Sequence, residues 1–485
     1  MISPRRCGLA ILSALCWIGS AIAGAGELPP EHECPSSSGL RDAGPAEDAA
    51  PALVREGMVL AYADVLRLAS LLPSEVLRHR QAFFSEGMRM EIGPCHRRYP
   101  QPRFYRLASE QFAGRPQLDA DGNLAGYTAG LPFPPEAIDP GAADAGARWA
   151  WNVELRYRGA GPRGRFRIVD LPSRVGDVQT YRGSWFQLQT AHRADLAETD
   201  YRAGDPGPAA WIAGGRFAEP ADARALAWRQ MRPQGFAQRS SLPDDITVYV
   251  PSLRKVRRAA SSWVDGLYAP RYRVTGSDRG GANAVGDIGR GSGGAVAPGA
   301  AASVAVTENL ARGFTGLSIR PNAYTWRLLG VREVLAPHNV ARTGFPGDPD
   351  RNFGPSGLSV ASDRWEVRQA VVIQGALREP GRDYDWLTLY VDTQTQQPLY
   401  VITQRRGGHL LEVGILLHRF SDDQPGYPAW PDGERASVFD PVAAVFYNAA
   451  DQSGWRRESY DVVSTPLDEG ELRRMTSDAY LERGH

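Results

Sequence analysis

Histidine and carboxylate side chains near residue 410 occur at spacings that could bind a metal or carry out acid–base chemistry. His409 and Glu412 have a ligand-like spacing, but an odd separation on a strand points them to opposite faces, whereas Glu412 and His418 would share a face. Neither pair comes with the third protein ligand of a catalytic zinc site. Glu412 with His418 is the one pair on which a hydrolase could rest.

Three further motifs are weaker. The string from Gly357 to Ala361 is similar to a nucleophile elbow around Ser359, but it lies in a Gly/Pro-rich loop and not at a strand-to-helix turn. The glycines of 289–294 match a dinucleotide fingerprint without the strand and helix that should flank it. His338 follows a predicted strand and is interpreted as a turn residue. We therefore predict no catalytic residue, no metal and no cofactor, and the protein is expected not to be an enzyme.

Aromatic side chains are the most suggestive chemical feature, because many fall on predicted strands. Each of them could simply pack in a core. A curved sheet covered by helices on its concave side can instead leave an apolar hollow that suits a lipid-like ligand. The candidate ligand-binding residues are Trp151, Tyr157, Trp185, Tyr249, Tyr324, Trp326, Trp365, Trp386, Tyr390 and Tyr400.

The first residues have the pattern of a secretory signal peptide. Arg5 and Arg6 form a positive region, 7–18 is apolar, and 21–23 (Ala-Ile-Ala) supplies a small-residue cleavage site, so cleavage is expected after residue 23. The apolar stretch is shorter than the roughly 20 residues of a membrane-spanning helix, so a retained anchor is the less favoured alternative. The chain is therefore expected in the periplasm, in association with the outer membrane as one option.

Processing leaves Cys34 and Cys95 as the only thiols in an oxidising compartment, and we expect them to form a disulfide, with two unpaired thiols as the alternative. Lys+Arg and Asp+Glu each total 55, so no charge bias favours nucleic acid, and arginine-rich patches are interpreted as ordinary surface.

The positioning elements are mostly strands. A tail over 24–55 precedes two short helices, one at 60–71 and one that begins at Ser74. The clearest alternation of apolar and polar residues predicts a strand over 149–157. Short turns between strands favour antiparallel pairing, the Gly/Ala-rich stretch 276–303 predicts a flexible loop, and Thr465 is expected to cap a C-terminal helix. Further predicted strands cover 166–169, 184–190, 246–250, 324–335, 364–373, 386–392, 399–405 and 410–420.

Several strings together resemble a family of uncharacterised secreted bacterial proteins whose fold is similar to that of the outer-membrane lipoprotein-sorting (LolA/LolB-like) proteins. They are Phe83–Gly93, Arg97–Pro100, Gly126–Pro134, Trp149–Asn152, Arg156–Gly159 and Tyr324–Leu335, with a weaker match at Tyr249–Arg258.

The resemblance implies an α+β fold: a large curved antiparallel sheet, an unclosed half-barrel, with helices on the concave face, formed by one domain over 56–485. It also implies a periplasmic carrier or chaperone for a hydrophobic, lipid- or sterol-like ligand. The partners it suggests are an inner-membrane transporter of the resistance-nodulation-division type and an outer-membrane protein. The alternatives are a non-catalytic adaptor at the outer membrane, or a hydrolase acting on a hydrophobic compound.

Overall fold

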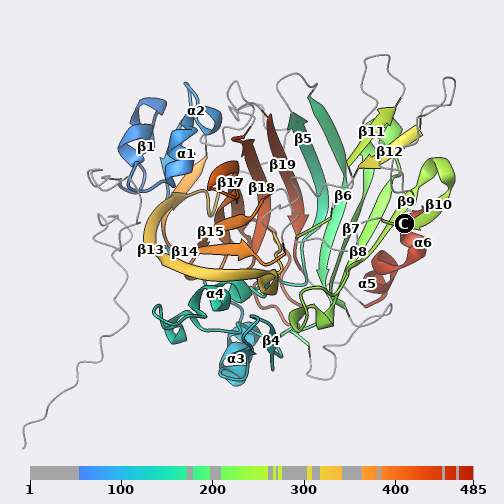
Figure 1. The fold of residues 1–485 in the computed structure, drawn as a ribbon, viewed down its shortest axis with the longest axis horizontal. Helices are drawn as coiled ribbons and strands as arrows, with labels where there is room; N and C mark the ends of the chain where they lie inside the picture. Colours follow the sequence, from blue (N-terminus) through green and yellow to red (C-terminus); the bar gives the residue numbers. More distant parts are fainter. Residues whose placement is uncertain are drawn as a thin grey trace, which may run out of the picture.

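One large sheet dominates the computed structural model (Figure 1). The structure describes residues 54–171, 178–196, 209–259, 266–268, 271–275, 303–307, 317–340, 363–379, 384–450, 454–465 and 469–483. The predicted signal peptide, the 24–53 part of the tail, Cys34, Ser359 and residues 276–302 of the predicted loop lie outside these residues.

The sheet has 15 strands in the order β1-β2-β14-β15-β16-β17-β18-β19-β5-β6-β7-β8-β9-β10, and β13 also pairs with β14. All its ladders are antiparallel except that of β2 with β14. Within the described part of the chain no ladder joins β10 to β13 or β1, so the sheet is not closed. The strands are β1 (Val59–Leu60), β2 (Met90–Ile92), β5 (Arg163–Leu171), β6 (Gln179–Gln189), β7 (Ala209–Glu219), β8 (Ala227–Pro233), β9 (Asp245–Val250), β10 (Lys255–Arg258), β13 (Tyr324–Ala336), β14 (Arg364–Leu377), β15 (Trp386–Asp392), β16 (Pro398–Arg405), β17 (His409–Phe420), β18 (Phe439–Asn448) and β19 (Gly454–Val463).

Two small hairpins and short helices surround this sheet. The hairpins pair β3 (Gln117–Leu118) with β4 (Leu124–Ala125) and β11 (Arg271–Thr275) with β12 (Ser303–Thr307). The α-helices are α1 (Ser74–Arg78), α2 (Arg80–Phe83), α3 (Arg103–Phe112), α4 (Ala145–Glu154), α5 (Glu469–Thr476) and α6 (Asp478–Arg483), and the 3-10 helices include η1 (Tyr62–Leu68), η2 (Pro135–Ala137) and η7 (Pro321–Ala323).

Both faces of the sheet are covered by helices. Side chains from α4 cluster with one face, which we call the α4 face, and this cluster includes Val371 and Ile373 of β14. The alternate residues Ala370 and Val372 cluster instead with η1, α1 and α2 on the opposite face. Strands buried on both sides lose the alternation of apolar and polar residues, which explains the nearly continuous apolar runs of β14 to β18.

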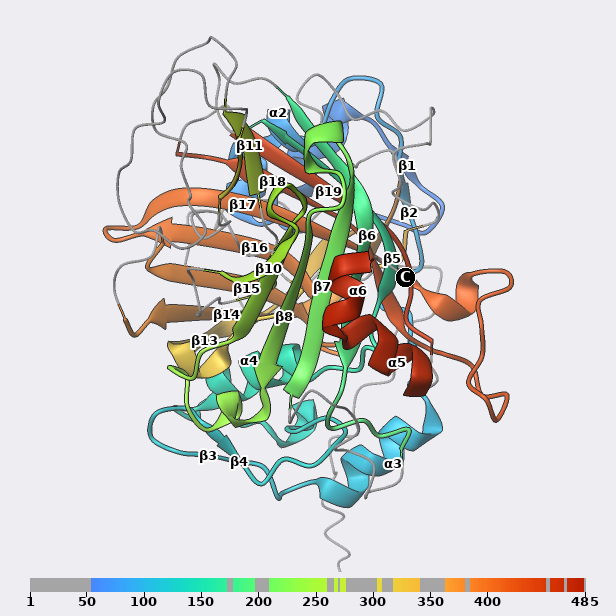
Figure 2. The ribbon, with the colours of Figure 1, turned by 90° about the vertical axis from the view of Figure 1, so that its right-hand side faces the viewer.

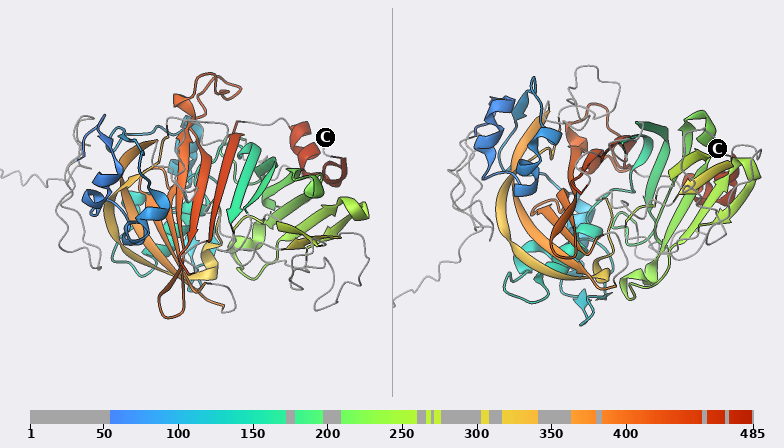
Figure 3. Two further views of the ribbon diagram at one scale, coloured as in Figure 1. Left: turned by 90° about the horizontal axis from the view of Figure 1, so that it is seen from above. Right: turned by 45° about the horizontal axis from the view of Figure 1, so that its top comes forward.

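The C-terminal helices cover the other half of that opposite face. Leu472 and Met475 of α5 pack with Phe186 of β6 and Ile212 of β7, and Figure 2 shows α5 and α6 lying across these strands. The N-terminal and C-terminal helices lie at opposite ends of the sheet (Figure 3). The predicted C-terminal helix is therefore present, whereas its expected first position, Pro466, lies outside the described residues.

The strand predicted over 149–157 is wrong, because these residues form most of helix α4. The prediction assumed that Asn152 and Glu154 point to solvent, yet both are buried. Asn152 accepts a hydrogen bond of 3.1 Å from the Phe133 amide and donates one of 2.6 Å to the Phe133 carbonyl. Because these polar side chains are buried with hydrogen-bond partners, the apolar residues alone do not show the helical period of about 3.6 residues. Trp151 is accordingly on a helix, and Tyr157 lies beyond its end and outside any strand.

The eight other predicted strands are confirmed as β5, β6, β9, β13, β14, β15, β16 and β17. The helix predicted over 60–71 is a 3-10 helix, and the one predicted from Ser74 is divided into α1 and α2. Cys95 is buried and disulfide-bonded, but its expected partner Cys34 is not among the described residues, so the pairing of these two cysteines stays a prediction.

Candidate functional site

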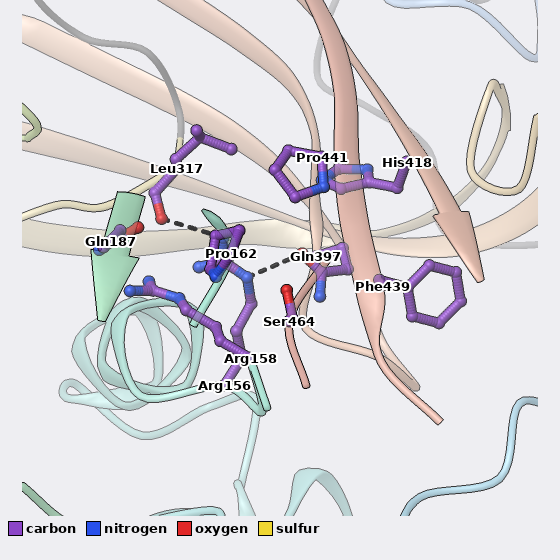
Figure 4. A pocket seen from close by; sticks show the side chains of 10 residues that line it. All are labelled: Arg156, Arg158, Pro162, Gln187, Leu317, Gln397, His418, Phe439, Pro441 and Ser464. Atoms are coloured by element: carbon purple, nitrogen blue, oxygen red, sulfur yellow. Dashed lines mark hydrogen bonds between the residues drawn. The ribbon is translucent and has the colours of Figure 1, made fainter. Parts of the chain in front are cut away.

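A small cavity of about 20 Å³ lies where the chain leaves α4 and meets the α4 face of the sheet (Figure 4). We call it the arginine pocket. Its walls come from segments far apart in the sequence, so only the folded sheet assembles it. The lining residues are Arg156, Arg158, Pro162, Gln187, Leu317, Gln397, His418, Phe439, Pro441 and Ser464.

Arg156 is held rigidly at this pocket by three neutral acceptors. Its guanidinium donates to the side-chain oxygen of Gln397 (2.8 Å), the carbonyl of Leu317 (3.0 Å) and the carbonyl of Val153 (2.5 Å). Burial and the nearby charge of Arg158 lower the pKa of Arg156 well below its ordinary value. Arg156 thus carries a buried positive charge with no carboxylate hydrogen-bonded to it.

Arg158 is less well satisfied. Its Nη2 lies 3.5 Å from both a Glu154 carboxylate oxygen and the Val153 carbonyl oxygen, while its Nε and Nη1 are buried without a hydrogen-bond partner among the described residues. Burial lowers the pKa of Arg158 as well. Guanidinium groups do not deprotonate in proteins, so this shift describes the cost of burying the charge.

Glu154 is the carboxylate nearest to both arginines, but other donors occupy it. It accepts hydrogen bonds from the Trp211 indole (3.0 Å), the Ser318 hydroxyl (2.7 Å) and the Ile319 amide (2.8 Å). These bonds tie the end of α4 to β7 and to the segment that leads into β13.

His418 enters the pocket at an irregularity in the sheet. The pairing of β17 with β18 shifts register between Leu417 and His418, opposite Pro441, which has no N–H to donate. Within the described part of the chain, neither ring nitrogen of His418 has a hydrogen-bond partner, and the same holds for Nε2 of Gln187. Burial, His338 and Arg156 lower the pKa of His418 well below its ordinary value, so its ring is neutral.

A second small cavity, of about 30 Å³, shares Arg156 and Arg158 with the arginine pocket. We call it the aromatic pocket, because Phe104, Tyr105, Tyr127 and Tyr157 are among the residues lining it. The rings of Tyr105 and Tyr157 are 5.0 Å apart. The two arginines therefore line both cavities, and His192, Arg193 and Asp195 add polar groups to the wall of the aromatic pocket.

The largest of the described cavities is a groove of about 640 Å³ beside α3, which we call the α3 groove. Its walls are mixed in character: Leu131 and Pro134 are apolar, and an ion pair of 2.9 Å joins Arg106 to Glu110. The lining residues are Tyr99, Gln101, Arg106, Ser109, Glu110, Ala113, Leu131, Pro134, Pro135, Glu136, Thr393, Gln394 and Gln396.

A buried polar network lies behind Tyr99. The Tyr99 hydroxyl donates to Glu366 (2.6 Å), whose carboxyl pKa is raised by burial. Arg368 pairs with Asp392 (2.8 Å).

His338, interpreted from the sequence as a turn residue, is buried beside this network and has its pKa lowered to about 3 by burial. A histidine with a pKa this low binds a proton only weakly, which makes it a poor general base at neutral pH.

The pair suggested for a hydrolase does not form. Glu412 lies 4.0 Å from Arg456, whereas His418 lies at the other end of β17 in the arginine pocket, and no described interaction joins the two. Among the described residues there is no group of three or more His, Cys, Asp or Glu that could hold a metal ion.

The ten aromatic candidates do not share one surface. Trp151, Trp185, Tyr324 and Trp326 are buried on the α4 face, while Trp365, Tyr390 and Tyr400 are buried on the opposite face. Tyr157, Tyr249 and Trp386 are half-buried. A contact of any of them with a ligand stays a prediction.

The sequence interpretation missed the arginines. The predicted strand placed Arg156 and Arg158 on its polar side, and this is wrong for both, because they are only 6% and 8% exposed. One feature of the sequence could have indicated their burial: they directly follow the mostly apolar stretch from Trp149 to Leu155. Nothing in the sequence pointed to Gln187 and His418, whose strands are distant in the chain.

Comparisons with known proteins give a family and several distant likenesses of fold. Among curated proteins, none matches this sequence. An outer membrane lipoprotein-sorting protein domain from Vibrio parahaemolyticus is similar with 14% identity and a TM-score of 0.36, over 70% of this chain and 100% of that one. A DUF1329 family protein from Desulfovibrio piger has 11% identity and a TM-score of 0.38, over 71% and 99% of the two chains. A LolA superfamily protein from Nitrosomonas europaea has 12% identity and a TM-score of 0.31, over 70% and 98%.

The family model described as "Protein of unknown function (DUF1329)" matches residues 67–274 and 295–453, which covers most of the chain. The match includes α4, both arginines and the strands from β2 to β18, apart from the last residue of β11, and leaves out β1 and β19. The expected membership of an uncharacterised family is confirmed, and the chain belongs to the DUF1329 family.

Proposed function

We propose that this protein is a periplasmic carrier or chaperone that binds a hydrophobic, lipid- or sterol-like ligand on the concave face of its sheet. The proposal takes residues 56–485 as one lipoprotein-sorting-like domain after a cleaved signal peptide. A transporter of the resistance-nodulation-division type and an outer-membrane protein, expected from the sequence resemblance, remain predicted partners. In the described part of the chain no helix is long and apolar enough to span a membrane.

The observation that carries the proposal is the position of α4 between the two ends of the sheet. Gly146 of α4 lies directly against β13, since a Cβ added there would be 2.8 Å from the carbonyl carbon of Arg327. At the other end of the helix, Glu154 is bonded to Trp211 of β7. Eight strands separate β13 from β7, so one ten-residue helix reaches both only if the sheet bends around it. This supports the α4 face as the concave face.

An ion pair between the two ends of the sheet supports the same curvature. Arg320, just before η7 and β13, pairs with Asp244 (2.5 Å), which directly precedes β9. Arg232 of β8 pairs with the same carboxylate (3.0 Å). Short segments, among them α4 and the β3–β4 hairpin with Leu124, thus pack against the α4 face.

The segments that cover the α4 face are short, and we propose that they can move away from the sheet reversibly to admit a ligand. A ligand with ten buried methylenes would gain roughly 8 kcal/mol gross at about 0.8 kcal/mol each, before the cost of association. We propose that such a ligand replaces contacts of α4 with the aromatic side chains of the α4 face. The α3 groove lies next to these segments and is the proposed opening.

A specific observation favours a second candidate, a non-catalytic adaptor at the outer membrane. Trp151, Tyr324 and Trp326 are at most 5% exposed, so the concave face is filled by the protein's own side chains. An adaptor would use this face as a core and present only its outer surface to partners.

Native mass spectrometry with organic extraction distinguishes the two candidates. The mature protein is purified from its own periplasm without detergent. A discrete lipid or sterol-like mass that is released on unfolding supports the carrier. A clean apo mass, together with no uptake from an offered panel of lipids, contradicts it and favours the adaptor.

A pair of leucine variants tests the proposed opening. Leu131→Lys places a charge in the wall of the α3 groove at a buried position, so its melting temperature is measured first, and Leu329→Lys is the control at an exposed site of β13. If the groove is the opening, the first variant takes up lipid more slowly than wild type and the second does not. Equal uptake rates in the two variants would remove the groove from the proposal.

A further inference from the structure

The arginine pocket has an excess of positive charge. Arg156 and Arg158 are both buried, and among the residues that the structure describes the only carboxylate hydrogen-bonded to either is Glu154, at a long 3.5 Å from Arg158. Glu154 compensates at most one of the two guanidinium charges. Burying an uncompensated charge is strongly unfavourable, so a fold that places two arginines side by side here implies a further anion.

The unsatisfied groups of the pocket are hydrogen-bond donors. Nε and Nη1 of Arg158 and Nε2 of Gln187 lack partners, and all three nitrogens carry hydrogens. The neutral ring of His418 adds one N–H to this set. Figure 4 shows Arg156, Arg158 and Gln187 on the same side of the pocket. Two further acids lie close by, but each has a partner: Asp440 accepts a hydrogen bond from Ser464 (2.5 Å) at the pocket wall, and Asp195 of the aromatic pocket pairs with Arg193.

The size of the cavity limits its occupant. About 20 Å³ is room for one or two water-sized groups. Water could accept hydrogen bonds but would leave the charge uncompensated. A carboxylate fits better, because its two oxygens match the fork of donors on a guanidinium and form the stronger, charge-assisted kind of bond.

We propose that the arginine pocket binds a carboxylate group through Arg158, Gln187 and His418. The carboxylate has two sources: the headgroup of an amphiphile, or a small free carboxylate. The first source rests on the proposed carrier function and the second does not. For an amphiphile, the rings of Phe104, Tyr105 and Tyr157, which line the aromatic pocket together with the same arginines, would contact the part of the chain next to the headgroup.

The test measures binding by isothermal titration calorimetry on the mature protein at constant ionic strength. The probes are hexadecanoate, hexadecan-1-ol with the same chain and a neutral headgroup, and acetate. The variants are Arg158→Gln and, as control, Arg165→Gln, which removes an exposed arginine paired with Asp461. We expect hexadecanoate to bind wild type and the control equally, and Arg158→Gln to weaken it by about ten-fold to a hundred-fold, with no change for the alcohol.

A second variant keeps the test decisive if Arg158→Gln does not fold. Gln187→Glu places a carboxylate inside the pocket, so we expect a higher melting temperature than wild type and loss of the stabilisation that acetate gives to wild type. A lower melting temperature for Gln187→Glu, or no effect of acetate and hexadecanoate on wild type, overturns the proposal.

The outcomes separate this site from the carrier function. Equal affinity for hexadecanoate and the alcohol removes the carboxylate site and leaves the carrier. Binding of acetate without either amphiphile keeps the site as one for a free carboxylate and contradicts the carrier.

Discussion

Glu154, the last residue of α4, accepts a hydrogen bond of 3.0 Å from the indole nitrogen of Trp211 in β7. This contact fastens the helix to a strand far across the sheet from β13, where the helix also packs. It also occupies a carboxylate oxygen that would otherwise be available to Arg158. One side chain therefore stabilises the curvature of the sheet and leaves the arginine pocket short of negative charge.

Glu154→Gln should destabilise the protein by about 3 kcal/mol, because an amide nitrogen cannot accept from Ser318 and Ile319 and Arg158 loses the carboxylate it pairs with. Urea unfolding followed by circular dichroism measures this. Glu110→Gln removes an exposed carboxylate paired with Arg106 and should change stability by less than about 1 kcal/mol. Equal effects of the two substitutions would show that the buried contacts of Glu154 contribute little.

Trp326→Ala should cost about 3–5 kcal/mol. Its indole donates to the Pro321 carbonyl (2.7 Å) and covers Gly375 of the neighbouring strand, where an added Cβ would be 2.9 Å from the ring. Trp386 is only half-buried, so Trp386→Ala should cost less than half as much in the same unfolding experiment. If either variant stays folded but loses bound ligand, that ring lines a ligand site. Unfolding without a separate effect on ligand would identify the ring as core.

Gly146→Ala tests how tightly α4 is held against β13. Helix propensity alone favours alanine by about 1 kcal/mol, but the added Cβ would be 2.8 Å from the Arg327 backbone, so we expect a net loss of stability. Ala147→Gly at the half-buried neighbouring position serves as reference and should cost about 1 kcal/mol from propensity alone. A stabilised Gly146→Ala variant would mean that α4 can move away from β13 at little cost.

Sequence patterns located the strands that appear in the sequence as apolar runs between polar turn residues. β15 and β16 are apolar runs bounded by the polar residues 393–397, and their limits lie within one residue of those predicted. Strands β7 and β18 were missed, because the first is rich in Ala and Gly and the second carries Asp440 and Pro441, residues that are unfavourable in strands. Helix α4 was mistaken for a strand, because Asn152 and Glu154 have buried partners.

The site was less predictable than the fold. Gln187, His418 and Leu317 reach the arginine pocket from β6, β17 and the segment before η7. Only the order of strands brings them together, and that order depends on pairing between segments hundreds of residues apart, as between β5 and β19. Local periodicity contains no information about such pairing. The burial of Arg156 and Arg158 likewise depends on tertiary contacts and not on local sequence.

Asp440 should give the protein a distinctive dependence of stability on pH. Burial raises the pKa of this carboxyl to about 7, although the hydrogen bond from Ser464 acts in the opposite direction. Its pKa in the unfolded chain is about 3.9. Between these two values the folded state keeps a proton that the unfolded state has released, so the free energy of unfolding falls as pH rises, by up to about 1.4 kcal/mol per pH unit. The contribution is fully present below pH 4 and is lost above pH 7.

Other buried groups contribute with both signs, so the difference between wild type and Asp440→Asn is the informative quantity. The raised pKa of Glu366 acts in the same direction as that of Asp440, and the lowered pKa of His338 acts in the opposite direction. These contributions cancel in the difference. Asparagine does not titrate, so the stability of Asp440→Asn relative to wild type should rise between pH 4 and pH 7, measured by urea unfolding across that range.

Ser464→Ala removes a bond that lowers the pKa of Asp440, so in a protein with this substitution the pH at which the slope ends should move above pH 7. A difference that stays constant from pH 4 to pH 8 would mean that Asp440 is already ionised in the folded protein, and the wall of the arginine pocket would then carry a negative charge of its own.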